Sequence, residues 1–367
     1  MLQVEGLAKV FVTGEGKVEA VRDVTFEVKT GEFFALLGPS GCGKTTTLRC
    51  IAGLEVPDAG EIWIDDEPVF SSTKGIVVPV HQREIGMVFQ SYAVWPHMTV
   101  AQNVGYPLTH GRRRLPSRET MKRVKDVLHL VQLDDLEKRP ASLLSGGQQQ
   151  RVAVARGLVA EPKLLLLDEP LSNLDAKLRV EMRQELRDLF ERLKLTALYV
   201  THDQEEALVL SHRIAVMHSG RITQVGSPME IYKEPANLFV AGFVGTTNLL
   251  QGRVRRKGQA GEGGLVATPL GQLSCSVPER MDEGHQVSIM FRPEAVTIHT
   301  DSYGSLNNLF AGTVRTLVFT GNRLEYDIQA GDLLIRVERS PYLQEIHKGQ
   351  SVWVEIPADR IRLLPAS

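Results

Sequence analysis

The sequence predicts an α/β domain followed by a smaller all-β domain, and three features of the chain indicate this. Residues 33–38, "FFALLG", and 163–170, "KLLLLDEP", are unbroken apolar runs, the form of strands buried on both faces of a parallel sheet. Leucine and methionine recur at spacings of three and four between residues 178 and 193, as in an amphipathic helix. From about Asn248 the chain changes to short alternating segments broken by Gly and Pro, which is typical of β structure.

The elements of the first domain follow one another as strand, helix and strand. The helix at 178–193 lies between the strand at 163–170 and a third apolar segment at 196–203, "TALYVTHD". Parallel strands joined through a helix imply a right-handed crossover. The segment "SPME" at 227–230 has a hydroxyl cap, Pro in the first turn and Glu three residues after the cap, so it predicts a helix that closes the domain. The predicted domains are 1–236 and 237–367.

The predicted all-β domain contains one clear alternating strand and two similar segments. In "RLEYDIQ", Leu324, Tyr326 and Ile328 share one face, the charged residues share the other, and "TGN" just before supplies a turn. Residues 287–298 and 352–363 each consist of a strand, a turn with Pro and an acidic residue, and a second strand. This likeness hints at two related β units.

Composition excludes several classes of protein. The 367 residues include 42 Lys and Arg against 44 Asp and Glu, a formal charge of -2, so the chain lacks the basic excess of most nucleic-acid binders. The basic run at 111–118 is interpreted as a solvated face. The three cysteines form no pair with disulfide or metal spacing, which favours the cytosol. The N-terminus lacks the pattern of a signal peptide, and no stretch approaches the roughly 18 apolar residues of a membrane helix, so work at a membrane would require other, spanning chains.

A phosphate-binding motif follows the first apolar strand. Residues 38–45, "GPSGCGKT", fit G-x-x-x-x-G-K-[ST], in which glycines let backbone N–H groups surround phosphate oxygens. Lys44 would place a charge near the β and γ phosphates, and Thr45 would hold Mg²⁺. The alternative is an idle Gly-rich turn, which the position between a strand and a predicted helix disfavours. Cys42 is interpreted as a packing residue, because no base accompanies it.

Polar side chains end the other predicted strands. Asp168 suits Mg²⁺ through water, and Glu169 is placed to orient or deprotonate an attacking water; the alternative is a strand end that is acidic by chance. His202 could donate to the γ phosphate, although a lone His is more often structural. Gln90 ends "EIGMVFQ" and could contact both Mg²⁺ and water. Because the carboxyl ends of parallel strands share one rim, these residues are expected to converge.

A second candidate anion site lies at residues 144–151, "LSGGQQQR". Ser145, Gly146 and Gly147 precede a segment with helical spacing, so two exposed glycines are expected at a helix N-terminus with free N–H donors. The alternative is an ordinary helix cap, which would be favoured if nothing else were known. A cap, however, does not require two exposed glycines after it.

With these motifs in this order, the sequence resembles the ATPase subunit of an ATP-binding cassette (ABC) transporter. The resemblance covers nearly the whole chain and rests on "GPSGCGKTT", "MVFQ", "LSGGQQQR", "LLLLDEP", "SNLDA" and "THD". It implies an ABC-type P-loop NTPase domain with a helical subdomain at about residues 91–160. The β-rich region resembles the paired small-barrel regulatory domain, of the OB/MOP or TOBE type, of importers for sugars, polyamines, ferric iron or oxyanions. "FVGTTNLL" (243–250) and "RPE" (292–294) carry that likeness.

The resemblance assigns roles to individual residues. In that family the signature "LSGGQ" of one subunit closes on ATP held by the P-loop of another, which implies a homodimer. Glu169 would be the base and His202 its polar partner, while Asp175 would link the two sites. Phe11 would stack on adenine; its alternative is a core residue of an early strand. The phosphates and Mg²⁺ would be bound by Ser40, Gly41, Cys42, Gly43, Lys44, Thr45 and Thr46, by Gln90 and Asp168, and from the partner subunit by Ser145, Gly146 and Gly147.

The implied function is that of an ATPase that powers an importer from the cytoplasmic face of the membrane. Gln90 and the following "SYAVWPHMTV" match the segment that receives a coupling helix, which is consistent with an exposed Trp95-Pro96. The implied partners are two transmembrane permease subunits and an external solute-binding protein, with no nucleic acid. One alternative is an ABC ATPase in repair or translation, which usually carries long coiled coils or a second cassette. Another is a sensing module with vestigial hydrolysis, which the intact motifs disfavour. The solute is not predicted, since the ATPase need not touch it.

Overall fold

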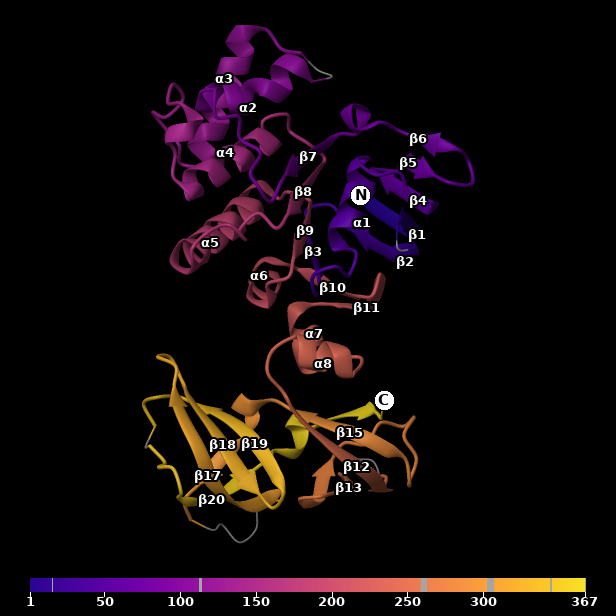
Figure 1. Ribbon diagram of the computed structural model, residues 1–367, viewed down its shortest axis with the longest axis vertical. Coiled ribbons are helices and arrows are strands. Elements are labelled where there is room, and N and C mark those ends of the chain that lie inside the picture. The colour runs from indigo at the N-terminus through magenta and orange to yellow at the C-terminus, as the bar shows by residue number, and fades with distance from the viewer. Residues whose placement is uncertain (15, 112–113, 259–262, 302–306, 344, 367) are drawn as a thin grey trace. The chain divides into compact units, whose positions relative to one another are not determined.

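Figure 1 shows the computed structural model, which describes residues 1–14, 16–111, 114–258, 263–301, 307–343 and 345–366. The chain divides into two compact units, Met1–Ile231 and Tyr232–Ser367, which share no apolar core. The division falls inside α7 (Pro228–Lys233), ahead of the boundary at 236/237 expected from the sequence. Tyr232 belongs with the second unit because Arg292 Nη2 donates to its backbone oxygen at 2.8 Å. Within the basic run at 111–118, Arg112 and Arg113 lie outside the described residues.

The first unit is built on a six-stranded sheet in the order β11-β10-β3-β9-β8-β7. The pairs formed by β10, β3, β9, β8 and β7 are parallel, and β11 is antiparallel to β10. Strands β3, β8 and β9 are buried along their whole length, which confirms the prediction from the apolar runs. The bounds are β3 (Phe33–Leu37), β7 (Ile85–Val88), β8 (Leu164–Asp168), β9 (Ala197–Thr201), β10 (Arg213–His218) and β11 (Arg221–Gly226).

Two apolar cores cover opposite faces of this sheet. Neighbouring residues of one strand point to different cores: Phe33 belongs to the first and Phe34 to the second. The first core is completed by α2 (Val100–His110), α3 (Ser117–Leu130), α4 (Gly146–Leu158) and α5 (Ala176–Leu193). The second core includes α1 (Lys44–Ala52), and Figure 1 shows α1 on the other side of β3 and β9 from α4 and α5. Helix α5 matches the helix predicted at 178–193 and begins where Asp175 accepts a hydrogen bond from Leu178 N at 3.0 Å.

An antiparallel sheet that the sequence analysis did not predict completes the second core. Its order is β2-β1-β4-β5-β6, with β1 (Leu2–Thr13), β2 (Gly16–Val28), β4 (Ala59–Ile64), β5 (Glu67–Ser71) and β6 (Ile76–Val77). Strand β1 is interrupted by register shifts against both neighbours, and these shifts interrupt the alternation of apolar and polar residues. Buried Arg83 joins this sheet to the end of α1, donating to the backbone oxygens of Cys50, Ile51 and Val69.

The second unit contains two five-stranded sheets with the same internal order. The first sheet has the order β14-β13-β12-β15-β21. The second has the order β19-β18-β17-β20-β16, so strands at the same place in the two orders correspond to each other. The similar segments at 287–298 and 352–363 occupy equivalent places, and each gives its second strand to the other half's sheet. The alternation predicted in "RLEYDIQ" is confirmed, because Leu324, Tyr326 and Ile328 are all buried.

The strands of the second unit surround one large core, and α8 (Leu238–Phe243) packs in a smaller apolar cluster formed by Ala241, Met290 and Leu364. The segment 287–298 forms β15 (Gln286–Phe291), η3 (Pro293–Ala295) and β16 (Thr297–His299), and 352–363 forms β20 (Ser351–Glu355), η4 (Ala358–Arg360) and β21 (Arg362–Pro365). The other elements are β12 (Asn248–Arg256), β13 (Gly264–Thr268), β14 (Gly271–Cys275), β17 (Leu309–Phe319), β18 (Leu324–Ala330) and β19 (Leu333–Arg339).

Candidate active site

The loop between β3 and α1 has the backbone geometry of an anion cradle. Gly41 and Gly43 have φ angles of 78° and 104°, which L side chains rarely adopt. A Cβ on Gly43 would also lie 2.2 Å from the backbone oxygen of Ala20. Helix α1 starts directly after Gly43, and no side chain caps its first N–H groups. Those N–H groups and the positive end of the helix therefore remain available for phosphate oxygens.

Lys44 is held inside this loop. Its Nζ donates to the backbone oxygens of Gly38 at 2.7 Å and Pro39 at 2.9 Å, and the residue is only 4% exposed. The ammonium is thus fixed beside the turn that would receive phosphate. Cys42 is buried, and burial raises the pKa of its thiol although Lys44 opposes the shift. The thiol is therefore kept neutral, in agreement with its interpretation as a packing residue.

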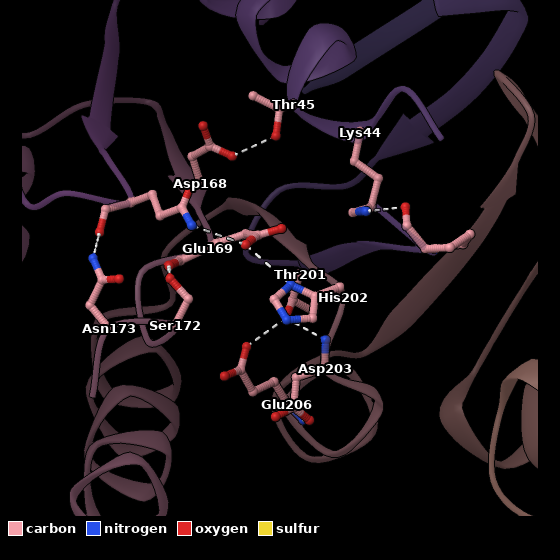
Figure 2. Close-up of polar contacts among 12 residues, drawn as sticks. Lys44, Thr45, Asp168, Glu169, Ser172, Asn173, Thr201, His202, Asp203 and Glu206 are labelled. Atoms are coloured by element: carbon pink, nitrogen blue, oxygen red, sulfur yellow. Dashed lines mark hydrogen bonds and ion pairs between the residues drawn. The ribbon is translucent and has the colours of Figure 1, made fainter. Parts of the chain in front are cut away.

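Thr45 and Asp168 meet across the P-loop. Thr45 Oγ1 donates to Asp168 Oδ1 at 3.0 Å, so the first turn of α1 touches the end of β8 (Figure 2). Asp168 is buried, and burial raises the pKa of its carboxyl, while the hydrogen bond from Thr45 lowers it. A buried carboxylate whose negative charge is this poorly solvated is stabilised by a cation nearby.

Glu169 is held from two sides on one oxygen. Gln90 Nε2 lies 3.4 Å and His202 Nδ1 lies 3.1 Å from its Oε2, and Figure 2 shows Glu169 with Asp168 and His202 beside it. Its backbone has φ 43°, a strained conformation at the end of β8 that turns the chain sharply. Asn173 Nδ2 donates to the backbone oxygen of Gln90 at 2.7 Å and so holds the backbone from which the Gln90 side chain extends. The predicted convergence of Gln90, Asp168, Glu169 and His202 is therefore present.

A buried carboxyl that the sequence analysis missed supports His202. Glu206, at 2% exposure, accepts hydrogen bonds from Tyr199 at 2.8 Å and from Thr201 at 2.6 Å. Thr201 Oγ1 in turn accepts from the backbone N–H of Asp203 at 2.9 Å, so the network fixes the chain on both sides of His202. In the sequence, the only sign of Glu206 is that "EE" (205–206) follows closely after "TH" (201–202). That interval does not reveal that Glu206 points inward.

Glu206 should make the stability of the first unit depend on pH. Burial raises the pKa of its carboxyl, so the folded chain retains this proton in a pH range where the unfolded chain has lost it. The free energy of unfolding therefore falls as pH rises from the ordinary Glu pKa through the raised value. Glu206→Gln should flatten this dependence in urea titrations at a series of pH values. Asp168, whose pKa is also raised, contributes equally to the pH dependence of the unmodified chain and of Glu206→Gln.

A matched variant distinguishes the charge of Glu206 from its hydrogen bonds. Glu206→Ala should cost about 2–4 kcal/mol, because it leaves the hydroxyls of Tyr199 and Thr201 buried without their acceptor. An unchanged pH slope in Glu206→Gln would contradict the assignment.

The segment "LSGGQ" begins helix α4 with a capping box. Ser145 Oγ accepts from Gln148 N, and Gln148 Oε1 accepts from Ser145 N at 3.1 Å, so the cap weighed as an alternative is present. Ser145 and Gly146 are exposed. The expectation of two exposed glycines is wrong for Gly147, which is buried. A Cβ there would lie 3.1 Å from Leu178 Cδ2, so this glycine allows α4 to pack closely on α5.

The two candidate anion sites of the chain lie apart. Helix α1 packs its Leu48 and Ile51 into the second core, whereas α4 packs Val152 and Ala155 into the first, on the opposite face of the sheet. Among the described residues, no hydrogen bond or ion pair joins residues 145–147 to the P-loop. Within one chain the segment at Ser145 therefore does not complete the P-loop site.

Phe11 lies on β1, whose neighbour β2 contacts the P-loop, and Asp175 begins α5, which packs against α4. Phe11 pairs with Val18 across β1 and β2 and is half-buried, with Lys9 Nζ 5.3 Å from its ring centroid. It belongs to neither core cluster of the first unit, which argues against its alternative as a core residue. Ala20, close to Val18 on β2, faces Gly43 of the P-loop. Asp175 caps α5.

The segment after Gln90 is held in an unusual conformation by Arg156. Tyr92 and Ala93 have φ angles of 60° and 46°, and Arg156 donates to both backbone oxygens at 2.7 Å and 2.6 Å. The Arg156 guanidinium also lies 4.8 Å from the Trp95 ring centroid, and Tyr106 packs on the same ring. Trp95 is consequently half-buried, so the expected exposure is wrong for Trp95, whereas Pro96 is exposed as expected.

We expect Arg156→Lys to destabilise the first unit by about 1–2 kcal/mol, because an ammonium cannot make the planar two-carbonyl contact and stack on Trp95. Hydrogen exchange should increase at Tyr92, whose N–H donates to the backbone oxygen of Phe89 at 2.9 Å in the turn that Arg156 holds, and urea titration gives the stability change. Arg187→Lys, at a half-exposed site on α5, is the control and should stay within about 0.5 kcal/mol. Equal protection of Tyr92 in both variants would contradict the role of Arg156.

Comparison with known proteins agrees with this geometry. A family model described as "ABC transporter" matches residues 21–172, and one described as "TOBE domain" matches residues 289–364. The chain is 41% identical to the spermidine/putrescine import ATP-binding protein of Thermobifida fusca, over 99% of this chain and 93% of the relative. It is 57% identical to the trehalose/maltose import ATP-binding protein of Thermococcus litoralis, over 63% of this chain and 62% of the relative.

Solved structures show the same cassette fold. A bacterial ABC transporter cassette solved as a dimer is 32% identical, with a TM-score of 0.54, and the match covers 62% of this chain and 99% of that one. The same cassette in a post-hydrolysis state with ADP and Pi gives equal values. The fold predicted for residues before the β-rich domain is confirmed by these matches.

Proposed function

The chain belongs to the ABC transporter family as an ATP-binding ATPase subunit with a C-terminal TOBE domain, and from this premise we propose that it powers a membrane importer for a small solute. The observation that carries the proposed mechanism is the fixation of Glu169 by Gln90 and His202 on a single oxygen. In the part of the chain that the structure describes, Oε1 of Glu169 has no hydrogen-bond partner. That oxygen is free to accept a proton from water.

The chain's own groups divide the work of hydrolysis. The N–H groups at the start of α1 and the Lys44 ammonium bind the phosphates and offset the charge that develops on them. Glu169 orients and deprotonates the attacking water, and His202 positions Glu169 and donates toward the γ phosphate. Gln90 joins this rim to the segment at Tyr92 and Ala93, so movement of that segment would reach the carboxylate.

The donors at Thr45 and Asp168 fit a magnesium ion. Mg²⁺ prefers hard oxygen ligands, and a hydroxyl and a carboxylate oxygen lie 3.0 Å apart here, with the amide of Gln90 on the same rim. The raised pKa of Asp168 has the sign expected of a carboxyl that is built to face a cation. When bound, the ion would neutralise charge on the β and γ phosphates.

The position of α4 supports a head-to-tail homodimer. The exposed cap at Ser145 lies across the sheet from the P-loop of its own chain, so the anion site that it forms is available to a second copy. A related cassette has been solved as a dimer. We therefore assign Ser145, Gly146 and the backbone of Gly147 to the γ phosphate of the partner's ATP, Asp175 to the contact between the sites, and Phe11 to the adenine.

The import role follows from the relatives, whose names describe import ATP-binding proteins for polyamines and for trehalose or maltose. Among the described residues, no helix is both long and apolar enough to cross a membrane. We propose that the chain acts at the cytoplasmic face of a membrane with two permease subunits and an external solute-binding protein. The relative that matches along the whole chain is named for spermidine and putrescine. The relative with higher identity over the cassette is named for trehalose and maltose. Their names do not single out one solute for this chain, and the proposed classes are sugars, polyamines, ferric iron and oxyanions.

Copurification tests the import role against an ABC ATPase that acts in repair or translation. The tagged chain, extracted from its native membrane in mild detergent, should bring down two multi-span proteins identified by mass spectrometry. Comigration with ribosomes or DNA in place of membrane proteins would overturn the import role, while leaving the ATPase chemistry intact.

A further inference from the structure

The backbones of Glu169 and Gln90 are both held by one short segment, residues 172–174, which we call the anchor segment. Ser172 Oγ donates to the backbone oxygen of Glu169 at 2.9 Å, and Asn173 Nδ2 donates to that of Gln90 at 2.7 Å (Figure 2). The side chain of Gln90 in turn reaches the Glu169 carboxylate. The anchor segment therefore fixes the proposed base relative to one of the two groups that hold it.

Arg179 connects the anchor segment to the strand end that carries His202. It lies near the start of α5, and its Nη2 donates to the backbone oxygen of Leu174 at 3.0 Å. Its Nη1 forms an ion pair with Asp203, at 3.6 Å from Oδ2. Asp203 directly follows His202 in the chain. One guanidinium thus joins the anchor segment to the residue beside the second group that holds the base.

Asp203 can transmit this contact because its other polar groups are also held. Its Oδ1 accepts from two backbone N–H groups in the first turn of α6 (Gln204–Leu210), at 2.8 Å and 3.2 Å. Its own N–H donates to Thr201 Oγ1 at 2.9 Å, and its Oδ2 faces Arg179. Loss of the guanidinium would therefore release the backbone beside His202 on the side of α5.

The contacts of Arg179 differ from those of an ordinary ion pair on a helix surface. Arg187, on the same helix, pairs with Glu191 one turn away, and both side chains are about half exposed. A pair of that kind contributes little to stability. Arg179 instead has a side chain only 30% exposed, and two of its nitrogens contact two separate segments of the chain. The planar fork of a guanidinium holds two such partners in a fixed relation, which an ammonium cannot do.

We propose that Arg179 is a positioning residue for ATP hydrolysis, which keeps His202 in line with Glu169 and Gln90 through the anchor segment. This role rests on the proposed function, in which His202 positions Glu169 and donates toward the γ phosphate. A displacement of about 1 Å in such a group can lower a rate by about 10²-fold. The phosphates are bound by Lys44 and the start of α1, which Arg179 does not contact.

The first test compares two substitutions of Arg179 in the full-length chain. Arg179→Met keeps the apolar stem without the donors, and it should lower kcat for ATP hydrolysis by about 10-fold while KM for ATP changes by less than about 2-fold. Arg179→Lys can still pair with Asp203 and should recover about 3-fold of this loss. Arg187→Met, which removes an ion pair from the same helix, is the control and should keep kcat within about 2-fold.

A double-mutant cycle tests the contact with Asp203. Asp203→Asn keeps an oxygen to cap α6 but removes the charge that faces Arg179, so it should lower kcat about as much as Arg179→Met. The double variant should lose no more than about 2-fold beyond either single change, since both break the same contact. This arm decides the question even if Arg179→Met folds poorly, because Asp203→Asn keeps the cap and can be compared with Arg179→Lys.

The outcomes separate this role from the proposed function. An unchanged kcat in Arg179→Met, an equal loss in Arg187→Met, or losses that multiply in the double variant would each overturn the role of Arg179. If His202→Ala lowers kcat strongly while Arg179→Met does not, the proposed function stands and this inference alone fails. A normal kcat in His202→Ala would remove His202 from the mechanism, and the role of Arg179 would fall with it.

Discussion

Glu169→Gln is expected to lower the rate of ATP hydrolysis by about 10²–10⁴-fold while ATP binding is retained. An amide cannot accept the proton of the attacking water, yet it keeps the size of the side chain and one oxygen to face Gln90 and His202. The phosphates are bound by other groups, the α1 N-terminus and Lys44, which this change does not touch. The variant should therefore accumulate as a dimer with ATP trapped between its subunits, visible by light scattering.

The control for this prediction is Glu181→Gln, at an exposed position on α5. This change should leave both the rate of hydrolysis and the oligomeric state as they are in the unmodified chain. A Glu169→Gln protein that hydrolyses ATP at the normal rate would remove Glu169 from the role of base. A protein that no longer binds ATP would indicate instead that the strained turn at Glu169, with φ 43°, had been disturbed.

The sequence predicted the parts of the fold and site that depend on local pattern. Strands β3, β8 and β9 are buried on both faces, so each is an apolar run that can be recognised without knowledge of its neighbours. The convergence of Gln90, Glu169 and His202 followed from one rule, that parallel strands present their carboxyl ends at one rim. That rule requires only the order of the strands.

Features that depend on contacts between distant segments were not predictable in this way. Arg156 is one of two arginines in α4, and only the folded chain shows that it holds Tyr92 and Ala93 in left-handed conformations. Gly147 was interpreted as an exposed donor, yet its lack of a side chain serves the packing of Leu178. The exchange of β16 and β21 between the two sheets of the second unit likewise needs partners far away in sequence.

Mixing two inactive variants should restore ATP hydrolysis if subunits complete each other's sites. Lys44→Ala removes the P-loop ammonium, and Ser145→Arg places a bulky cation at the exposed start of α4, so each homodimer contains two defective sites. A heterodimer of the two variants contains one site with both defects and one with neither. In a 1:1 mixture half of the dimers are heterodimers, so roughly a quarter of the sites should be intact if the sites act independently.

The measurement is the rate of ATP hydrolysis in the mixture compared with each variant alone, each of which should fall by about 10²-fold or more. Circular dichroism of Ser145→Arg controls for folding, since loss of the cap should cost only about 1 kcal/mol. The helices α4 and α1 pack in separate cores on opposite faces of the sheet, so recovered activity in the mixture is expected to come from a site shared between two chains. Activity of the mixture no higher than the mean of the two variants would mean that each chain hydrolyses ATP without its partner's signature, and the head-to-tail dimer would have to be abandoned.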